Sequence, residues 1–181
     1  MSSRLTLPCV LAVSGSDSSA GAGLQADLKT CSALGVYAAT AVTAQNSLGV
    51  EKVESVSGPM VRQQMLSVLE DLSVSVIKIG MLGDAEVVEA VVKVLRDYPD
   101  IPVVLDPVLI SSTGRLLLDL AGRELMIKQL FPLVTLLTPN VAEAAYLSGT
   151  SEAEVDADPE SAVGLVAGLG VGAVLLKGGH R

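Results

Sequence analysis

Short apolar runs alternate along the chain with longer segments in which apolar residues recur at every third or fourth position. The runs are typical of buried β-strands, and the longer spacing is typical of amphipathic helices. The runs predict strands at residues 9–13, 37–44, 74–79, 102–105, 134–137 and 173–176, with a weak edge strand within 52–57. The helical spacing predicts helices at residues 24–34, 59–72, 85–98, 120–130, 141–147 and 162–169. The acidic segment 152–160 is interpreted as a solvated surface loop.

This repeated strand–helix order predicts one α/β domain over residues 1–181, with a mostly parallel sheet and helices on both faces. Polar side chains follow the apolar part of most strands, namely Ser16 and Asp17, Gln45 and Asn46, Asp106, Asn140 and Lys177. The carboxyl ends of parallel strands share one edge of the sheet, where ligands bind in open α/β folds. The pattern therefore predicts a ligand site at that edge.

The composition narrows the class of protein. Of 181 residues, 50% are hydrophobic and 18% are charged, which excludes a disordered chain. The net charge of −8 and the lack of a basic tract argue against nucleic acid or an anionic membrane as a partner. Arg4 with the apolar run 5–13 loosely resembles a signal peptide, but that run continues into predicted folded structure. No apolar run reaches the roughly 18 residues of a membrane span, so we expect a soluble, cytoplasmic protein.

Cysteine and histidine usage excludes several catalytic classes. Cys9 and Cys31 fall in predicted core elements and are interpreted as reduced, buried thiols. His180 is the one histidine, so we expect neither a Ser-His-Asp or Cys-His site nor a multi-histidine metal site.

A glycine-rich loop joins the first strand to the first helix. Its glycines at 15, 21 and 23 do not fit the dinucleotide fingerprint, and no Gly-Lys-Ser/Thr follows them. The loop is typical either of a tight turn or of a backbone that a small molecule approaches closely beside a helix N-terminus. Asp27 lies beside the apolar face of that helix and needs a hydrogen-bonding partner, which is either a neighbouring protein group or a ligand.

Four later polar residues fall at predicted strand ends or helix starts. Asn140 and Glu143 form an N-x-x-E pattern, which a capping box alone explains. Together with Asp106 and Lys177 they offer oxygen ligands for a hard cation and a positive charge for a phosphate. That combination is typical of Mg²⁺-dependent phosphoryl transfer.

The sequence of these motifs resembles the hydroxymethylpyrimidine/phosphomethylpyrimidine kinases of thiamine biosynthesis, a family of the ribokinase-like superfamily. Residues 14–30 look like the family's opening signature, and the later blocks 43–46, 78–81, 105–108, 138–143 and 177–180 follow in the same order. The resemblance covers nearly the whole chain and implies a three-layer ribokinase-like α/β fold. It also implies ATP-dependent phosphorylation of 4-amino-5-hydroxymethyl-2-methylpyrimidine and then of its monophosphate.

Individual site residues follow from the matched motifs. The positions that enclose the aminopyrimidine in the family correspond to Gly15, Asp27, Gln45, Met81 and Val108. Among them, Asp27 and Gln45 are implied to be the polar contacts of the ring. The positions around Mg²⁺ and the ATP phosphates correspond to Asp106, Asn140, Glu143 and Lys177, with Asp106 and Glu143 at the metal.

Two departures from the family pattern set expectations for activity. The family continues past the Lys177–His180 block to a Gly-Thr-Gly-Cys-like helix start that supplies backbone amides and the presumed base, whereas this sequence ends at Arg181. We therefore expect the C-terminal part of the fold to be missing, no catalytic base among the 181 residues, weak pyrimidine binding and slow turnover. Residues 36–45 are about three residues shorter than in the family pattern, which predicts an altered presentation of Gln45.

Two other functions remain open on the sequence. Pyridoxal- and pyridoxine-type kinases share the superfamily, and a non-catalytic pyrimidine-binding remnant would keep the same motifs. The sequence does not decide between them, and it gives no oligomeric state, although uncovered apolar surface favours a homo-oligomer.

Overall fold

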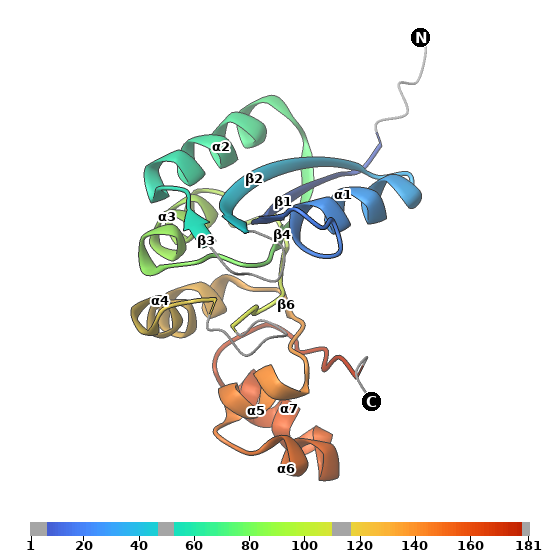
Figure 1. Ribbon diagram of the computed structural model, residues 1–181, viewed down its shortest axis with the longest axis vertical. Coiled ribbons are helices and arrows are strands. Elements are labelled where there is room, and N and C mark those ends of the chain that lie inside the picture. The colour runs from blue at the N-terminus through green and yellow to red at the C-terminus, as the bar shows by residue number, and fades with distance from the viewer. Residues whose placement is uncertain (1–6, 47–52, 110–116, 179–181) are drawn as a thin grey trace.

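The computed structural model describes residues 7–46, 53–109 and 117–178. Its centre is a six-stranded sheet in the order β3-β2-β1-β4-β5-β6 (Figure 1). The strands are β1 (Cys9–Asp17), β2 (Tyr37–Asn46), β3 (Val53–Ser55), β4 (Val74–Ile79), β5 (Val103–Leu105) and β6 (Leu136–Leu137). The edge strand β3 runs antiparallel to β2, and all other neighbours are parallel. The predicted mostly parallel α/β sheet is confirmed.

Helices cover both faces of this sheet. α1 (Gly23–Ala33) leads from β1 outward to β2, whereas the later crossovers lead the opposite way across the sheet. Right-handed crossovers therefore place α1 on one face and the later helices on the other. These later helices are α2 (Gly58–Asp71), α3 (Ala85–Asp97), α4 (Leu120–Leu125) with the π-helical turn η2 (Met126–Leu130), and the short 3₁₀ turn η3 (Phe131–Leu133). Figure 1 shows α2, α3 and α4 stacked along one side of the strands.

The core forms where the apolar strands meet the apolar faces of these helices. Leu11, Val13, Ile77 and Ile79 on the two central strands are all fully buried. α3 is the most strongly amphipathic helix, with Val87, Val88, Val91, Val92, Val94 and Leu95 in the same core cluster. Asp84 caps this helix, as predicted, by accepting a 3.0 Å hydrogen bond from the N–H of Val87.

The C-terminal region differs from its prediction in two places. Residues 152–160 are not a loop, because α6 (Glu152–Ala157) and the start of α7 (Pro159–Ala167) occupy them and pack with α5 (Val141–Ser148). Val155 and Ala162 are buried in a small separate cluster, which explains why this acidic segment is helical. The predicted last strand at 173–176 is present only as isolated bridges, from Val174 to Leu137 and from Lys177 to Asn140.

The cysteines are both free, and only one is fully buried. Cys9 is buried in β1, and this burial raises the pKa of its thiol. Cys31, expected to be buried, is half-buried on α1. In the part of the chain with described coordinates, no helix is long and apolar enough to cross a membrane.

Candidate functional site

The glycine-rich loop is folded around its own carboxylate. Asp17, the last residue of β1, accepts hydrogen bonds from Ser19 Oγ (2.7 Å), Gly21 N (3.1 Å) and Ala22 N (2.9 Å) through Oδ2, and from Ser19 N (3.1 Å) through Oδ1. The Ser19 hydroxyl and these backbone N–H groups hold the pKa of Asp17 below its usual value. The carboxylate thus fixes the path of the loop into α1.

Gln25 closes the other side of the loop. Its Oε1 accepts a 2.9 Å hydrogen bond from Asp17 N, and its Nε2 donates a 2.7 Å hydrogen bond to Ser16 Oγ. From the sequence, Asp17 was placed only among the polar residues at strand ends, and Gln25 was given no role. The available signal was an acidic residue directly before a glycine-rich turn, because such side chains commonly bond the local backbone.

Two glycines bring the backbone of this loop close to its surroundings. Gly23 has φ +56°, and a Cβ at this position would lie 2.3 Å from the carbonyl oxygen of Gly15. A Cβ on Gly15 would in turn lie 2.6 Å from Cε of Met81. The loop therefore packs at the carboxyl ends of β1 and β4, where Gly15 and Met81 lie next to each other.

Met81 is held in place by two neighbouring strands. Its N–H donates to Ser14 Oγ at 3.2 Å, and its carbonyl oxygen accepts from Thr43 Oγ1 at 2.5 Å. Ser14, Thr43 and Met81 are all buried, with exposed fractions of 2%, 0% and 7%. Buried hydrogen bonds from β1 and β2 therefore fix the backbone of Met81 in this part of the site.

Asp27 has a protein partner. Lys78 on β4 donates to Asp27 Oδ2 over 2.8 Å, and the two side chains are 26% and 20% exposed. The partner that the sequence left open is therefore a lysine on strand β4, whereas Asp27 itself lies on helix α1. Lys78 was missed, although a lysine within the apolar run of β4 was a visible signal.

Gln45 and Val108 are the two remaining residues of the predicted aminopyrimidine site. Gln45 is exposed at the end of β2, where it lies opposite Ser16. The register between β1 and β2 shifts between Ser14 and Ser16, so Gln45 follows an irregularity in the ladder. Val108 is half-buried, and among the described residues no hydrogen bond joins Gln45 or Val108 to Asp27.

A second group of predicted residues meets at the other end of the same edge. Asp106 Oδ1 and Lys177 Nζ are 2.6 Å apart, although 71 positions separate them in sequence. Lys177 is bridged to Asn140, and its N–H donates to the carbonyl oxygen of Pro139 at 2.8 Å. Asp106, Asn140 and Lys177 are thus brought together, as predicted.

Glu143 completes this group from the first turn of α5. Its Oε2 accepts from Asn140 N and its N–H donates to Asn140 Oδ1, both at 2.9 Å, which forms the predicted capping box. Glu143 is only 5% exposed, and this burial raises the pKa of its carboxyl group. The nearby Asp106 raises that pKa further, while the backbone N–H of Asn140 and the Lys177 ammonium oppose the shift.

The donor set at this edge fits a hard divalent cation together with phosphate. Asp106 and Glu143 supply carboxylate oxygens, and Mg²⁺ in proteins commonly takes one or two carboxylates with the remaining sites on substrate phosphates and water. Within residues 7–46, 53–109 and 117–178, no group of three or more His, Cys, Asp or Glu side chains is placed to hold a metal. A cation held by these two carboxylates would therefore need its remaining ligands from phosphate or water.

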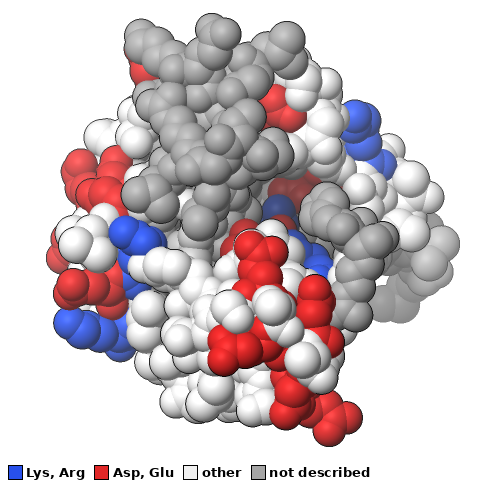
Figure 2. All heavy atoms as spheres, turned by 60° about the horizontal axis from the view of Figure 1, so that its bottom comes forward, with Lys and Arg blue, Asp and Glu red and all other residues white. Residues whose placement is uncertain are grey.

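A cavity and an acidic surface lie beside the group formed by Asp106, Asn140, Glu143 and Lys177. A cavity of about 420 Å³ adjoins the Lys177 segment and is lined by Pro159, Glu160, Val163, Leu176 and Gly178. Figure 2 shows acidic side chains gathered on the face that α6 and α7 form. The exposed carboxylates there include Glu152, Glu154, Asp156, Asp158 and Glu160. Such a surface disfavours contact with nucleic acid or an anionic membrane.

Comparison with known proteins places the chain in a family. Residues 17–181 match the model of the phosphomethylpyrimidine kinase family. The hydroxymethylpyrimidine/phosphomethylpyrimidine kinase of Rhizobium meliloti is 45% identical over 173 residues, which cover 94% of this chain and 65% of that protein. The chain belongs to the phosphomethylpyrimidine kinase family, and the resemblance stated from the motifs is confirmed.

Solved structures agree with this assignment. The 2.06 Å crystal structure of phosphomethylpyrimidine kinase from Clostridium difficile 630 has a TM-score of 0.85 and 39% identity, covering 97% of this chain and 76% of that one. The pyridoxal kinase from Staphylococcus aureus, in complex with AMP-PCP and pyridoxal, has a TM-score of 0.81 and 33% identity, covering 96% and 63%. The chain spans between about one third and two thirds of the length of the first curated relatives it matches.

Proposed function

We propose that this chain carries the acceptor site and the Mg²⁺-nucleotide phosphate site of a hydroxymethylpyrimidine/phosphomethylpyrimidine kinase. The reaction transfers the γ-phosphate of ATP to the hydroxymethyl group of the aminopyrimidine, and then phosphorylates the monophosphate again. One observation carries the proposal. Asp106, Glu143 and Lys177 meet at the carboxyl edge of the sheet, at which the glycine-rich loop also lies.

The acceptor half is built from Gly15, Asp27, Gln45, Met81 and Val108. Gly15 and Met81 pack against each other, since a side chain at Gly15 would collide with Met81, and together they would offer an apolar surface to one side of a flat ring. Asp27 is a hydrogen-bond acceptor for the exocyclic amino group, and Gln45 both donates and accepts in one plane. The exposure of Gln45 leaves its amide free to turn toward a ligand.

The nucleotide half is built from Asp106, Asn140, Glu143 and Lys177. Asp106 and Glu143 would hold Mg²⁺, which neutralises phosphate charge during transfer. Lys177 carries a positive charge on a backbone segment that Asn140 and Pro139 fix in place. In the resting chain the Lys177 ammonium neutralises Asp106, and a bound phosphate offers it an alternative partner.

These residues act by positioning and by charge rather than by covalent chemistry. Phosphoryl transfer depends mainly on alignment of the reacting groups and on electrostatic stabilisation. The chain's own side chains would hold the acceptor hydroxymethyl group at the glycine-rich loop and hold the phosphates at the Asp106–Lys177 end.

An activity assay tests the proposal. The purified chain is incubated with the aminopyrimidine, ATP and Mg²⁺, and the pyrimidine monophosphate and ADP are followed by chromatography. We expect slow ATP-dependent formation of the monophosphate that Asp106→Asn abolishes. Binding of both ligands without any product would instead favour a non-catalytic pyrimidine-binding protein, and absence of pyrimidine binding would contradict the proposal.

A second candidate substrate is a pyridoxine-like ring. The structural similarity to the Staphylococcus aureus pyridoxal kinase favours it, since that protein is 33% identical and was solved with pyridoxal. Parallel calorimetric titrations with the aminopyrimidine and with pyridoxal separate the two. We expect the aminopyrimidine to bind more tightly, because the 45% identical relative is a pyrimidine kinase.

We further propose a cytoplasmic homo-oligomer. Large apolar side chains are exposed at Leu34 (74%), Tyr37 (54%), Leu165 (51%) and Leu175 (56%), and exposed apolar surface favours association. The two free thiols are consistent with a reducing compartment. Light scattering coupled to gel filtration measures the mass of the particle directly.

A further inference from the structure

Lys78 occupies an unusual position for a lysine. It lies on β4, a central strand of the sheet with β1 on one side and β5 on the other. Central strands of parallel α/β sheets are normally apolar, and lysine is rarely buried without a partner. Its neighbours along the strand, Ile77 and Ile79, are fully buried. The presence of a lysine at this position therefore needs a specific explanation.

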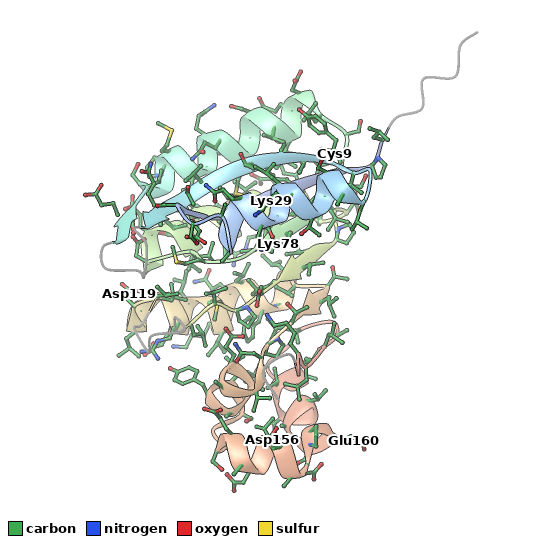
Figure 3. All side chains as sticks on the ribbon, turned by 45° about the vertical axis from the view of Figure 1, so that its right-hand side comes forward. Cys9, Lys29, Lys78, Asp119, Asp156 and Glu160 are labelled. Carbon is green, nitrogen blue, oxygen red and sulfur yellow. The ribbon has the colours of Figure 1, made fainter. Side chains whose placement is uncertain are left out.

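Within the described residues, Lys78 donates a hydrogen bond to Asp27 and to no other residue. The 2.8 Å contact uses Oδ2 of the carboxylate, and within those residues Oδ1 accepts no hydrogen bond. The pair is far less exposed than the Lys93–Glu89 pair of α3, whose side chains are 59% and 54% exposed. Lys78 reaches from β4 toward α1 and its surroundings are shown in Figure 3.

Gly80 locates the Lys78 ammonium at the acceptor site. A Cβ on Gly80 would lie 3.2 Å from Lys78 Nζ and 2.4 Å from Ser14 Oγ. Ser14 precedes Gly15 and accepts the hydrogen bond from Met81 N. The absence of a side chain at Gly80 thus leaves room for the ammonium near Ser14, which adjoins the residues that contact the ring in the proposed function.

We propose that Lys78 is a positioning residue of the acceptor site. It fixes Asp27 through Oδ2 and leaves Oδ1 to accept a hydrogen bond from the exocyclic amino group of the ring. This inference rests on the proposed function, since it assigns Asp27 to the aminopyrimidine. Removing the ammonium would leave a partly buried carboxylate without its partner and free to rotate. The affinity for a ring that carries the amino group would then decrease.

Calorimetry with two rings and with Mg²⁺-ATP tests this role. Lys78→Met and Lys78→Gln remove the charge, Lys78→Arg restores a cation, and Lys93→Met is the matched control on an exposed pair. The ligands are the aminopyrimidine, the same ring without its amino group, and Mg²⁺-ATP. Thermal unfolding followed by circular dichroism shows which variants fold cooperatively. The test needs only one of the two neutral variants to fold.

We expect the neutral variants to bind the aminopyrimidine at least tenfold more weakly, with Mg²⁺-ATP affinity unchanged. The loss should disappear for the ring that lacks the amino group, Lys78→Arg should recover part of it, and Lys93→Met should change neither affinity. Equal losses for both rings, or for Mg²⁺-ATP as well, would make Lys78 purely structural and overturn the inference. Failure of the unsubstituted chain to bind the aminopyrimidine at all would instead overturn the proposed function.

Discussion

Glu143 combines a structural task and a proposed chemical task in one side chain. It closes the capping box of α5 and faces Asp106 and Lys177. Burial raises the pKa of Glu143, so over a range above the usual value of 4.5 the folded protein holds a proton that the unfolded chain has lost. The contribution of this carboxyl to stability is therefore most favourable at low pH and is lost as pH rises through the raised pKa.

Replacing Glu143 by glutamine is expected to separate the two tasks. The amide oxygen still accepts from Asn140 N, because glutamine also serves in capping boxes. At pH 7 we expect a melting temperature equal to or above that of the unsubstituted chain, and Mg²⁺-ATP binding weaker by about tenfold, or roughly 1.4 kcal/mol. Melting curves from pH 5 to 8 and calorimetric titrations measure both quantities.

The capping box of α6 provides the matched control. Glu154 accepts from Ser151 Oγ and Ser151 N on a fully exposed surface, and these bonds lower its pKa. Its contribution is of the opposite sign, being present above the unfolded pKa and lost as pH falls through the lowered one. Glu154→Gln should leave nucleotide affinity unchanged and should not raise the melting temperature. A loss of nucleotide binding in both variants would contradict the role of Glu143.

Other residue contacts show what the sequence leaves undetermined. The ion pair of Asp27 with Lys78 links positions 51 apart, and it exists because α1 packs on β1, the strand that neighbours β4. A motif match placed Asp27 at the ring, but it carried no information on its protein partner. Gln45 follows a register shift between β1 and β2, whose place depends on both strands together, and the expected change in its presentation stays a prediction.

At the scale of elements, strand–loop–helix order was predictable because apolar periodicity changes sharply at the glycine-rich loop. Helix α6 and the first residues of α7 were missed because the acidity of residues 152–160 was interpreted as solvation, whereas the rest of α7 falls within the helix predicted at 162–169. The signal was present, since Ser151 and Glu154 match the S-x-x-E pattern of a helix start. β6 has only two residues, and its extent is decided by pairing with β5 rather than by local sequence.

Two glycines with positive φ test the packing of the loop against the sheet. Gly23 and Gly35 have φ of +56° and +70°, so alanine at either position adopts a left-handed backbone. A Cβ at Gly35 meets no atom within 4 Å, and Gly35→Ala should cost about 1 kcal/mol. A Cβ at Gly23 meets the Gly15 carbonyl, and Gly23→Ala should cost about 3 kcal/mol.

Urea unfolding of the two variants measures the difference. We also expect Gly23→Ala to weaken binding of the aminopyrimidine, because the clash displaces Gly15 from Met81. Equal destabilisation by the two substitutions would show that the loop relaxes freely and does not hold Gly15 in place.

At the scale of the whole molecule, sheet topology assembles the site. Asp106 follows β5, while Lys177 follows a segment bridged to β6, so parallel neighbours bring two distant positions to one edge. The rule that strand ends of an open α/β sheet share an edge was sufficient to predict this meeting. The distances and the capping-box geometry needed the packed structure, because they depend on how α5 docks beside β6.

The central claim is that one chain holds two separate ligand sites, an aminopyrimidine site at Asp27 and a Mg²⁺-nucleotide site at Asp106. Calorimetric titration of the unsubstituted chain, Asp27→Asn and Asp106→Asn with each ligand tests it most directly. We predict binding of both ligands to the unsubstituted chain, loss of pyrimidine affinity alone in Asp27→Asn, and loss of Mg²⁺-ATP affinity alone in Asp106→Asn. Pyrimidine affinity that survives Asp27→Asn, or nucleotide affinity that survives Asp106→Asn, would contradict it.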